Sequence, residues 1–365
     1  MAQPEHPEKE GDKEMIREIF AKYYETADIR IPQIERREFG IGNKKKIDAR
    51  HLNFANLEEF RRYLCTNTPM FVSHSTAYYE FPGATPIQKK HWMGADLVFD
   101  LDIHAEGKYA AYAKLEEMKE DVNRLVNDFM INDFGISEEH IAMVFSGNRG
   151  YHVHVRDPAY LPLGGEERRE LVDYIMAQGL DYRKFFEFDE KKRLRGPSPD
   201  EGGYRGRLAR ATIRILNEKP GLISRKFLNE KEREFFISGV KEGNWSKTTL
   251  NLKDFPQRLA PVAEKLRVNS VNTDIGVTQD LSKLIRVPNS IHGETGLIAR
   301  IIDDIDKFDP FRDAVLKGDK KKIRFIEDVP EIEAAGTKAF RKDEVAEVPL
   351  DKALFFILKK SAVWS

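Results

Sequence analysis

The segment 95–102 constrains the fold most, because its side chains alternate in character with a period of two. Successive side chains of a β-strand point to opposite faces, so the alternation predicts a strand with one packed face. Asp100 and Asp102 fall together on the other face, with their Cα atoms about 6.5–7 Å apart. The packed face is formed by Ala95, Leu97, Phe99 and Leu101.

The rest of the chain carries both strand and helix patterns, which predicts an α/β fold of the mixed α+β kind. A glycine-bearing turn, Ser146–Gly150, separates the alternating or apolar runs Ile141–Phe145 and Tyr151–Val155 and predicts a hairpin. A strand is expected over 296–302, whereas 320–348 is charge-rich and loosely patterned. Helical periodicity begins near Glu14 and also covers 56–64, 114–134, 166–178 and 349–360.

The composition changes near residue 180. From there to about 265, charged residues dominate, glycine and proline cluster at 196–206, and helical fragments follow. We interpret this stretch as a mostly helical inserted subdomain. The predicted organisation is therefore 1–180 for the first part of the α/β domain, 181–265 for the insertion, and 266–365 for the second part with a C-terminal helix.

Charge and cysteine content narrow the class of protein. With 60 basic and 61 acidic residues, the formal net charge is −1, so any nucleic-acid contact must use local patches. The single cysteine, Cys65, excludes a disulfide framework and a cysteine-rich zinc site. No stretch approaches 18 apolar residues, and the acidic start lacks a signal-peptide core. We therefore expect a cytoplasmic protein, or a nuclear protein if the cell is eukaryotic.

Asp100 and Asp102 are candidates for a metal site. Mg²⁺ binds carboxylates together with substrate phosphate oxygens, and two such ions can activate a hydroxyl and stabilise leaving pyrophosphate. On its own, the D-x-D pattern fits an exposed sheet edge equally well. The packed opposite face shifts the balance, because neighbouring like charges on a packed strand cost stability unless a cation binds.

Two further segments suit a charged site. In the turn that contains Ser146, glycine allows close approach to phosphate, while Arg149 and His152 can donate to phosphate oxygens. In the stretch 274–292, Asp274 can supply a third carboxylate, and two cationic groups can hold a triphosphate. From the residues alone, the first segment is more often an ordinary hairpin turn, and the residues of the second are more often solvated surface residues. The two cationic groups are Arg286 and His292.

Taken together, the segments resemble the catalytic subunit of the archaeo-eukaryotic primases. The resemblance spans almost the whole chain in the family's order, and the joint pattern is highly specific although no single piece is. The matching segments are RREFG (Arg36–Gly40), LVFDLD (Leu97–Asp102), FSGNRGYHVHV (Phe145–Val155), TDIGVTQDLSKLIRVPNSIHGETG (Thr273–Gly296) and KFDPF (Lys307–Phe311).

The resemblance implies a role for individual residues. It implies that Asp100, Asp102 and Asp274 are the catalytic, metal-binding carboxylates. It places other residues in nucleotide-phosphate motifs or in the region that contacts the nucleotide and the neighbours of the metal site. These residues are Ser146, Arg149, His152, Arg286 and His292 for the motifs, and Arg37, Glu38 and Arg50 for the region.

The same resemblance implies the wider chemistry. The family's fold is a mixed α/β primase catalytic fold with an inserted helical subdomain. Its reaction is template-directed synthesis of short primers from NTPs or dNTPs on single-stranded DNA, with Mg²⁺ or Mn²⁺ as cofactor and pyrophosphate as product. The family also implies a heterodimer with a large regulatory subunit that contains an iron–sulfur cluster.

Two features depart from the family. Relatives carry a zinc knuckle of cysteines after the acidic strand, whereas 103–115 has no cysteine and only His104 as a candidate ligand. One ligand does not make a zinc site, so structural zinc is not expected. Asn148 stands at a position that is often basic in relatives, and we assign it no role.

Two other functions fit the residues alone. One is another metal-dependent enzyme with a D-x-D pair, such as a nuclease or a sugar-nucleotide transferase. The other is a nucleic-acid-binding module with an inactive acidic site. Candidate template-binding patches, each also typical of a solvated surface, are Lys44–Lys46, Lys191–Arg195, and Arg205, Arg207 and Arg210.

Overall fold

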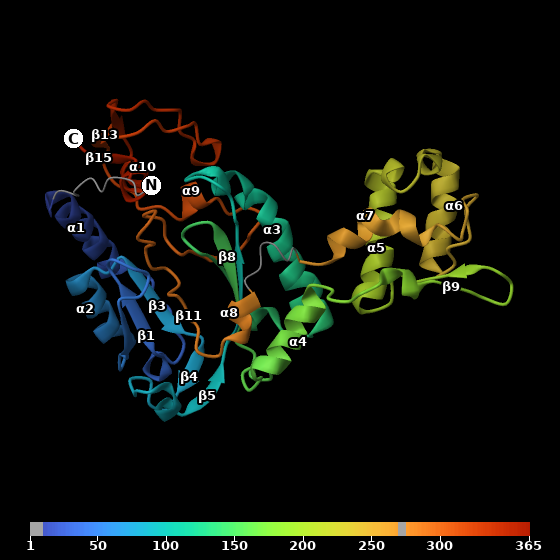
Figure 1. Ribbon diagram of the computed structural model, residues 1–365, viewed down its shortest axis with the longest axis horizontal. Helices are drawn as coiled ribbons and strands as arrows, with labels where there is room; N and C mark the ends of the chain where they lie inside the picture. The colour runs from blue at the N-terminus through green and yellow to red at the C-terminus, as the bar shows by residue number, and fades with distance from the viewer. Residues whose placement is uncertain (1–9, 269–274) are drawn as a thin grey trace. The chain divides into compact units, whose positions relative to one another are not determined.

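The computed structural model describes residues 10–268 and 275–365, which form two compact units (Figure 1). The α/β unit contains the described residues of Met1–Val122, Ser137–Arg169 and Val271–Ser365. The helical unit contains those of Asn123–Ile136 and Glu170–Ser270. The helical unit therefore extends beyond the predicted insertion 181–265, because earlier segments of the chain pack with it.

The first sheet of the α/β unit has the strand order β11-β3-β1-β2, and all its neighbours are antiparallel. Helix α2 is anchored on this sheet, since the rings of Phe60 and Phe39 lie 4.8 Å apart. Figure 1 shows α1 and α2 beside the sheet. The elements are α1 (Glu10–Thr26), β1 (Phe39–Gly42), β2 (Ala49–Leu52), α2 (Leu57–Asn67), β3 (Phe71–Ser75) and β11 (Leu284–Arg286).

The second sheet has the order β12-β7-β8-β6, so β6 lies at its edge. The predicted acidic strand and the predicted hairpin are both confirmed as antiparallel members of this sheet. The apolar face of β6 is buried, as the alternation predicted. The elements are β6 (Leu97–Asp102), β7 (Ile141–Phe145), β8 (Gly150–Val155), β12 (Ile301–Ile302) and the neighbouring helix α3 (Leu115–Asn123), which continues as a π-helix over Arg124–Asp133.

A buried ionic network links the start of β6 to the first sheet. Asp96 separates β6 from the ribbon of β4 (Ala77–Tyr79) and β5 (Trp92–Ala95). Its Oδ2 lies 2.8 Å from Arg37 Nη2 and 3.4 Å from Arg156 Nε. A buried charge is tolerated only when it is paired and hydrogen-bonded, so this network fixes where β6 begins.

Helix α8 (Ile275–Gln279) packs directly on β6. The Thr278 hydroxyl donates to the Val98 carbonyl oxygen at 2.8 Å. Val277, Val98 and Ile285 form a buried cluster. Because Ile285 belongs to β11, this cluster joins the edge strands of the two sheets.

The C-terminal part contains strands that the sequence did not reveal. The charge-rich stretch 320–348 forms two strands of a small sheet, ordered β14-β13-β15. The predicted closing helix is confirmed as α10, whereas the strand expected over 296–302 is reduced to the two residues of β12. The elements are α9 (Pro310–Asp313), β13 (Lys321–Phe325), β14 (Val345–Val348), α10 (Leu350–Leu358) and β15 (Ala362–Trp364).

The helical unit has its own aromatic core. The ring centroid of Phe236 lies 5.8 Å from Trp245 and 5.1 Å from Phe255, and all three side chains are buried. Helix α4 begins in the α/β unit and ends in the helical unit. The elements are α4 (Gly165–Ile175), β9 (Glu187–Phe188), β10 (Leu194–Arg195), α5 (Gly203–Glu218), α6 (Glu230–Lys241) and α7 (Ala260–Ala263).

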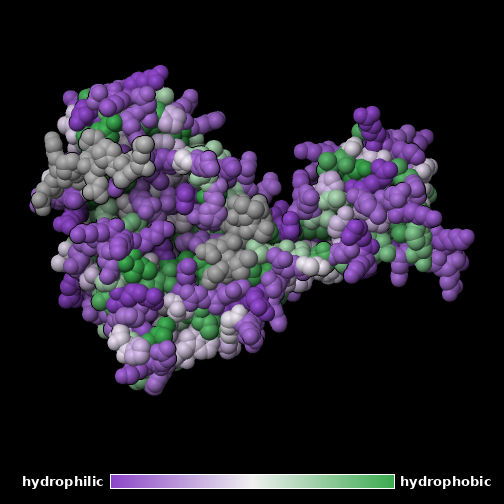
Figure 2. All heavy atoms as spheres, in the orientation of Figure 1, coloured by the Kyte–Doolittle hydropathy of each residue, from purple (hydrophilic) through white to green (hydrophobic). Residues whose placement is uncertain are grey.

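One predicted surface residue is instead internal. Arg207 is only 4% exposed; its Nη1 lies 2.9 Å from Asp133 Oδ2, and its guanidinium stacks on Phe129 and Tyr204. It therefore cannot belong to a template-binding patch. Figure 2 shows a largely hydrophilic surface with small apolar areas on the visible face of both units. Among the described residues, no helix is both long and apolar enough to cross a membrane.

Candidate active site

The two strand-borne carboxylates lie on the solvent-facing side of β6. The side chains of Asp100 and Asp102 are 22% and 32% exposed, whereas Leu101 between them is fully buried. Asp100 stands opposite His152, and Asp102 stands opposite Gly150 on β8. Among the described residues β6 is an edge strand, and it pairs only with β8.

The environment of Asp102 favours a bound cation. Burial raises the pKa of its carboxyl group, Arg149 opposes this rise, and the neighbouring Asp100 adds to it. Arg149 Nη2 donates to Asp102 Oδ2 at 3.3 Å. A carboxylate whose charge is penalised by burial and by a second carboxylate is stabilised by a metal ion at the same place.

The turn between β7 and β8 is docked, not free. Gly147 adopts a positive φ of 80°, and a Cβ atom there would come 2.9 Å from the Cβ atom of His292. The Thr295 hydroxyl donates to the Gly147 carbonyl oxygen at 2.5 Å. Ser146 Oγ accepts from the backbone N–H groups of Asn148 and Gly150, at 3.3 and 3.2 Å. The two predicted phosphate-contacting segments therefore touch each other.

His152 is a neutral ring beside the acids. Its Nε2 lies 3.5 Å from Asp100 Oδ1. Burial lowers the pKa of His152 to about 3, so the contact is not an ion pair at neutral pH. The buried Nδ1 of His152 and the buried Nε of Arg149 have no hydrogen-bond partner among the described residues. Their hydrogen-bonding capacity is therefore not used by the described residues.

Arg286 and His292 share one aromatic neighbour. The Arg286 guanidinium lies 5.5 Å from the Phe71 ring centroid, and the His292 ring meets Phe71 edge-on at 5.7 Å. Burial lowers the pKa of Arg286 to about 10, while the nearby Asp100 acts in the opposite direction. Arg286 Nη1 is buried and has no partner among the described residues. A buried guanidinium with an unsatisfied N–H group is typical of an anion-binding site.

Asp274, the third predicted carboxylate, lies outside the described residues. The described chain resumes at Ile275 with α8, which packs on β6 through Thr278 and Val277. Within the part of the chain that the structure describes, no group of three or more histidine, cysteine or carboxylate side chains is placed to hold a metal ion.

Arg37 is not placed to contact a nucleotide. Its side chain is fully buried, and its N–H groups donate to carbonyl oxygens of Ser75 and Thr76 and to Asp96. The role in nucleotide contact that the resemblance implied is therefore replaced by a structural one. The sequence could not distinguish nucleotide contact from a structural role, because an arginine beside a strand is compatible with either.

Arg50 keeps a half-exposed guanidinium. Its Nε lies 3.0 Å from the buried Glu38 Oε1, and its Nη2 donates to the Ser282 carbonyl oxygen at 3.4 Å. Lys90 Nζ lies 3.3 Å from the other Glu38 oxygen. Arg50 therefore reaches the loop after α8, and its contact with nucleotide stays a prediction.

Two lysines lie near the site without a motif to mark them. Burial dominates the pKa of both Asp102 and His292, and the positive charge of Lys46 acts on each group to lower its pKa. Lys359, which follows α10, also lowers the pKa of His292. Sequence reasoning assigned Lys46 only to a template patch and did not single out Lys359, since only tertiary packing brings these residues to the turn.

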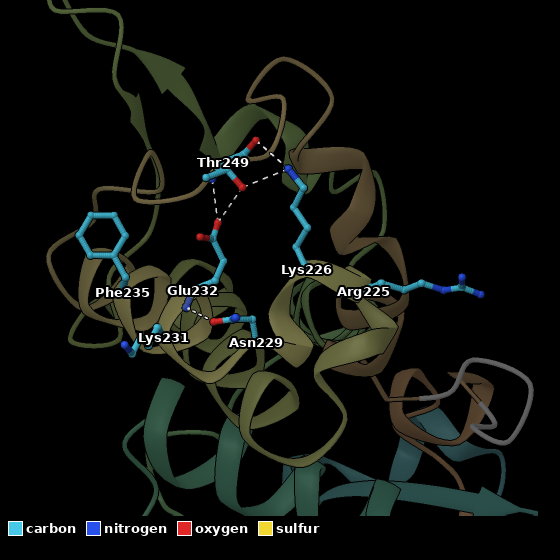
Figure 3. A pocket seen from close by; sticks show the side chains of 7 residues that line it. All are labelled: Arg225, Lys226, Asn229, Lys231, Glu232, Phe235 and Thr249. Carbon is cyan, nitrogen blue, oxygen red and sulfur yellow. Dashed lines mark hydrogen bonds between the residues drawn. The ribbon is translucent and has the colours of Figure 1, made fainter.

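A hollow of about 540 Å³ in the helical unit is not this site (Figure 3). Its polar groups bond to each other: Lys226 Nζ donates to Thr249 Oγ1 at 3.0 Å, and Glu232 Oε1 accepts from the Thr249 backbone N–H at 2.8 Å. We assign it no chemistry. It is lined by Arg225, Lys226, Asn229, Lys231, Glu232, Phe235 and Thr249.

Comparison with known proteins gives a consistent answer. The profile of the DNA primase small subunit family matches residues 99–304. The DNA primase small subunit PriS of Methanococcoides burtonii is 33% identical, over 96% of this chain and 98% of that protein. The PriS proteins of Methanothrix thermoacetophila and Thermoplasma volcanium are each 34% identical; the alignments cover 83% and 84% of this chain, and 86% and 83% of those proteins. The chain therefore belongs to the family of DNA primase small subunits.

Proposed function

We propose that this catalytic subunit makes short primers on single-stranded DNA by joining nucleoside triphosphates with release of pyrophosphate. The observation that carries the proposal is the meeting of an acidic pair with buried, unsatisfied donors. Asp100 and Asp102 lie beside His152 and Arg149, and Arg286 interacts with Asp100 from the other sheet. A triphosphate with a divalent cation matches that distribution of charge.

The family depends on divalent metal ions, and we assign Mg²⁺ or Mn²⁺ to Asp100, Asp102 and Asp274. Such ions, when bound, activate an attacking hydroxyl and stabilise the leaving pyrophosphate. The two strand carboxylates fit this group, because their side chains share one face of β6 and burial penalises the charge of Asp102. Asp274 lies outside the described residues, and its membership of this group rests on the match of the segment Thr273–Gly296 to the family's pattern.

The chain's own donors would hold the triphosphate. Arg149 and Arg286 supply positive charge, whereas the neutral rings of His152 and His292 supply directed hydrogen bonds. The 3′-hydroxyl of one nucleotide would then attack the α-phosphate of the other in line, with pyrophosphate as the leaving group. The protein contributes positioning and fixed charge, and forms no covalent bond to the substrate.

Template contact would be electrostatic and sequence-tolerant. We propose the α/β unit as the catalytic part, and the inserted helical unit as a carrier of template contacts. We also propose a heterodimer with a large regulatory subunit, and a place in the cytoplasm of an archaeal cell. The remaining candidate template patches are Lys44–Lys46, Lys191–Arg195, and Arg205 with Arg210.

Primer synthesis by point variants tests the proposal. Asp100→Asn and Asp102→Asn remove one negative charge each at nearly constant shape, and Asp319→Asn is the exposed control. On unprimed single-stranded DNA with NTPs and Mn²⁺, both site variants should lose at least about 100-fold in rate, with an unchanged thermal midpoint. Primer synthesis by both site variants at the control's rate would refute the assignment. Degradation of the template instead of extension would indicate a nuclease.

A further inference from the structure

Helix α10 is packed against the segments that form the proposed phosphate site. A Cβ atom at Gly296 would lie 3.0 Å from Leu354 Cβ and 3.2 Å from Leu358 Cδ1, so the helix touches the loop that carries His292. The ring of Phe355 meets Tyr112 edge-on at 5.2 Å. These contacts fix the last turn of α10 close to the turn between β7 and β8.

Lys359 follows α10 directly and extends to that turn. Its Nζ donates to Asn148 Oδ1 at 3.4 Å and lies 5.2 Å from the Tyr112 ring centroid. The Tyr112 hydroxyl donates to the same Asn148 oxygen at 2.9 Å. Asn148 precedes Arg149, so the ammonium group is held beside the residues that we assign to phosphate.

The charge of Lys359 is not neutralised by a direct ionic partner among the described residues. The structure gives it no ion pair with any described carboxylate, although Glu294 interacts with it from a greater distance. Burial is the main cause that lowers its pKa to about 8; the cations Arg149 and Lys108 act in the same direction, and Glu294 acts against them. A partly buried ammonium group among other cations is costly for the fold unless a ligand supplies negative charge.

We propose that Lys359 is an additional phosphate-binding residue, whose ammonium group contacts a non-bridging oxygen of the nucleoside triphosphate held at the Ser146–Gly150 turn. This inference rests on the proposed function. The alternative for a lysine at a helix C-terminus is stabilisation of the helix dipole alone. The template backbone offers the same phosphate chemistry, and binding measurements with and without template separate these sources.

The test compares Lys359→Gln and Lys359→Arg with the neighbouring exposed control Lys360→Gln. Loss of one charge-assisted hydrogen bond should raise the KM for NTP about tenfold with little change in kcat. Lys359→Arg should restore most of the affinity, and Lys360→Gln should leave KM within twofold. In calorimetric titration without template, Lys359→Gln should weaken NTP binding and leave nucleoside monophosphate binding unchanged.

Several outcomes overturn the inference. They are an unchanged KM in Lys359→Gln, an equal rise in Lys360→Gln, or a lower thermal midpoint as the only effect. Weaker binding of a labelled oligonucleotide with unchanged NTP affinity would assign the ammonium group to the template backbone and also overturn it. Failure of the proposed function is distinguishable, since the unsubstituted protein would then make no primer or Asp102→Asn would remain active.

Discussion

Arg37 carries a guanidinium that is closed to solvent and shared among four acceptors. They are the carbonyl oxygens of Pro32, Ser75 and Thr76 and the carboxylate of Asp96. Asp96 is equally buried. Removing one partner of such a pair leaves an uncompensated charge, which costs more than the intact pair contributes.

We therefore expect Arg37→Met to lower the free energy of unfolding by about 3–5 kcal/mol. The neighbouring Arg36→Met, which leaves the network intact, should change it by no more than about 0.5 kcal/mol. Urea unfolding followed by circular dichroism provides the comparison. Equal stability of the two variants would show that the Asp96 network does not hold the sheets.

Single residues could be placed from the sequence where local geometry alone determines their position. Asp100 and Asp102 share a face because alternation along a strand requires it. Arg37 has no such local constraint, since its burial depends on Asp96, which is 59 residues away. Lys359 was missed for the same reason: its partner Asn148 is 211 residues distant in the chain.

Among the elements, the turn between β7 and β8 depends most on its surroundings. The left-handed conformation of Gly147 and its closeness to His292 both oppose a side chain there. Gly107 also has a positive φ, of 97°, but a Cβ atom at that position would meet nothing within 4 Å. Comparing Gly147 with Gly107 therefore separates the cost of a positive φ for a non-glycine residue from the cost of a steric clash with His292.

We expect Gly147→Ala to raise the KM for NTP several-fold, because the turn must move from the loop at His292. Both Gly147→Ala and Gly107→Ala should cost about 1–3 kcal/mol in backbone strain. Only the former should alter KM, as measured by steady-state kinetics on the stable fraction. If both glycine variants bind NTP equally well, the docking of the turn has no part in substrate binding.

Elements were predicted where periodicity was strong and missed where charges mask it. In β13, Ile323 and Phe325 are buried while Lys322 and Arg324 are exposed. That is a regular strand, but the charge-rich stretch around it hides the alternation. The predicted strand 296–302 was too long, because only Ile301 and Ile302 pair with β7, whereas Ile298 forms an isolated bridge with Ile291.

The molecule as a whole contains several histidines that the fold keeps neutral. Burial lowers the pKa of His74 and His152 to about 3 and that of His154 and His292 well below the ordinary value. Unfolding exposes the rings, which then bind protons with a pKa of about 6.5. The unfolded state therefore takes up more protons, and stability falls as the pH drops below about 6.5.

For each of these histidines, the free energy of unfolding should fall by about 1.4 kcal/mol per pH unit below 6.5. His154→Gln removes one of them, at a position to which we assign no role. Between pH 7.5 and 5.5, the variant should therefore lose about 1.4 kcal/mol less than the parent in urea titrations. The same pH dependence in both proteins would mean that His154 is protonated in the folded state.

For the whole molecule, the sequence indicated a mixed fold with a helical insertion. The boundaries of the helical unit in the structure nevertheless differ from those predicted for the insertion. Segment 123–136 belongs to the helical unit, whereas most of α3, which the π-helix Arg124–Asp133 continues, belongs to the α/β unit. Periodicity identifies such a helix without showing where its neighbours change.

The donors proposed for the triphosphate come from both sheets: Arg286 from β11, and His152 from β8. A nucleotide held by both would act as a removable cross-link between the two sheets. Because nucleotide binds the folded state, its binding should raise the free energy of unfolding by about 2.7 kcal/mol at a nucleotide concentration of about 100 times Kd. Slower amide hydrogen exchange in β8 and β11 at saturating nucleotide would show that the bound substrate stabilises the two sheets.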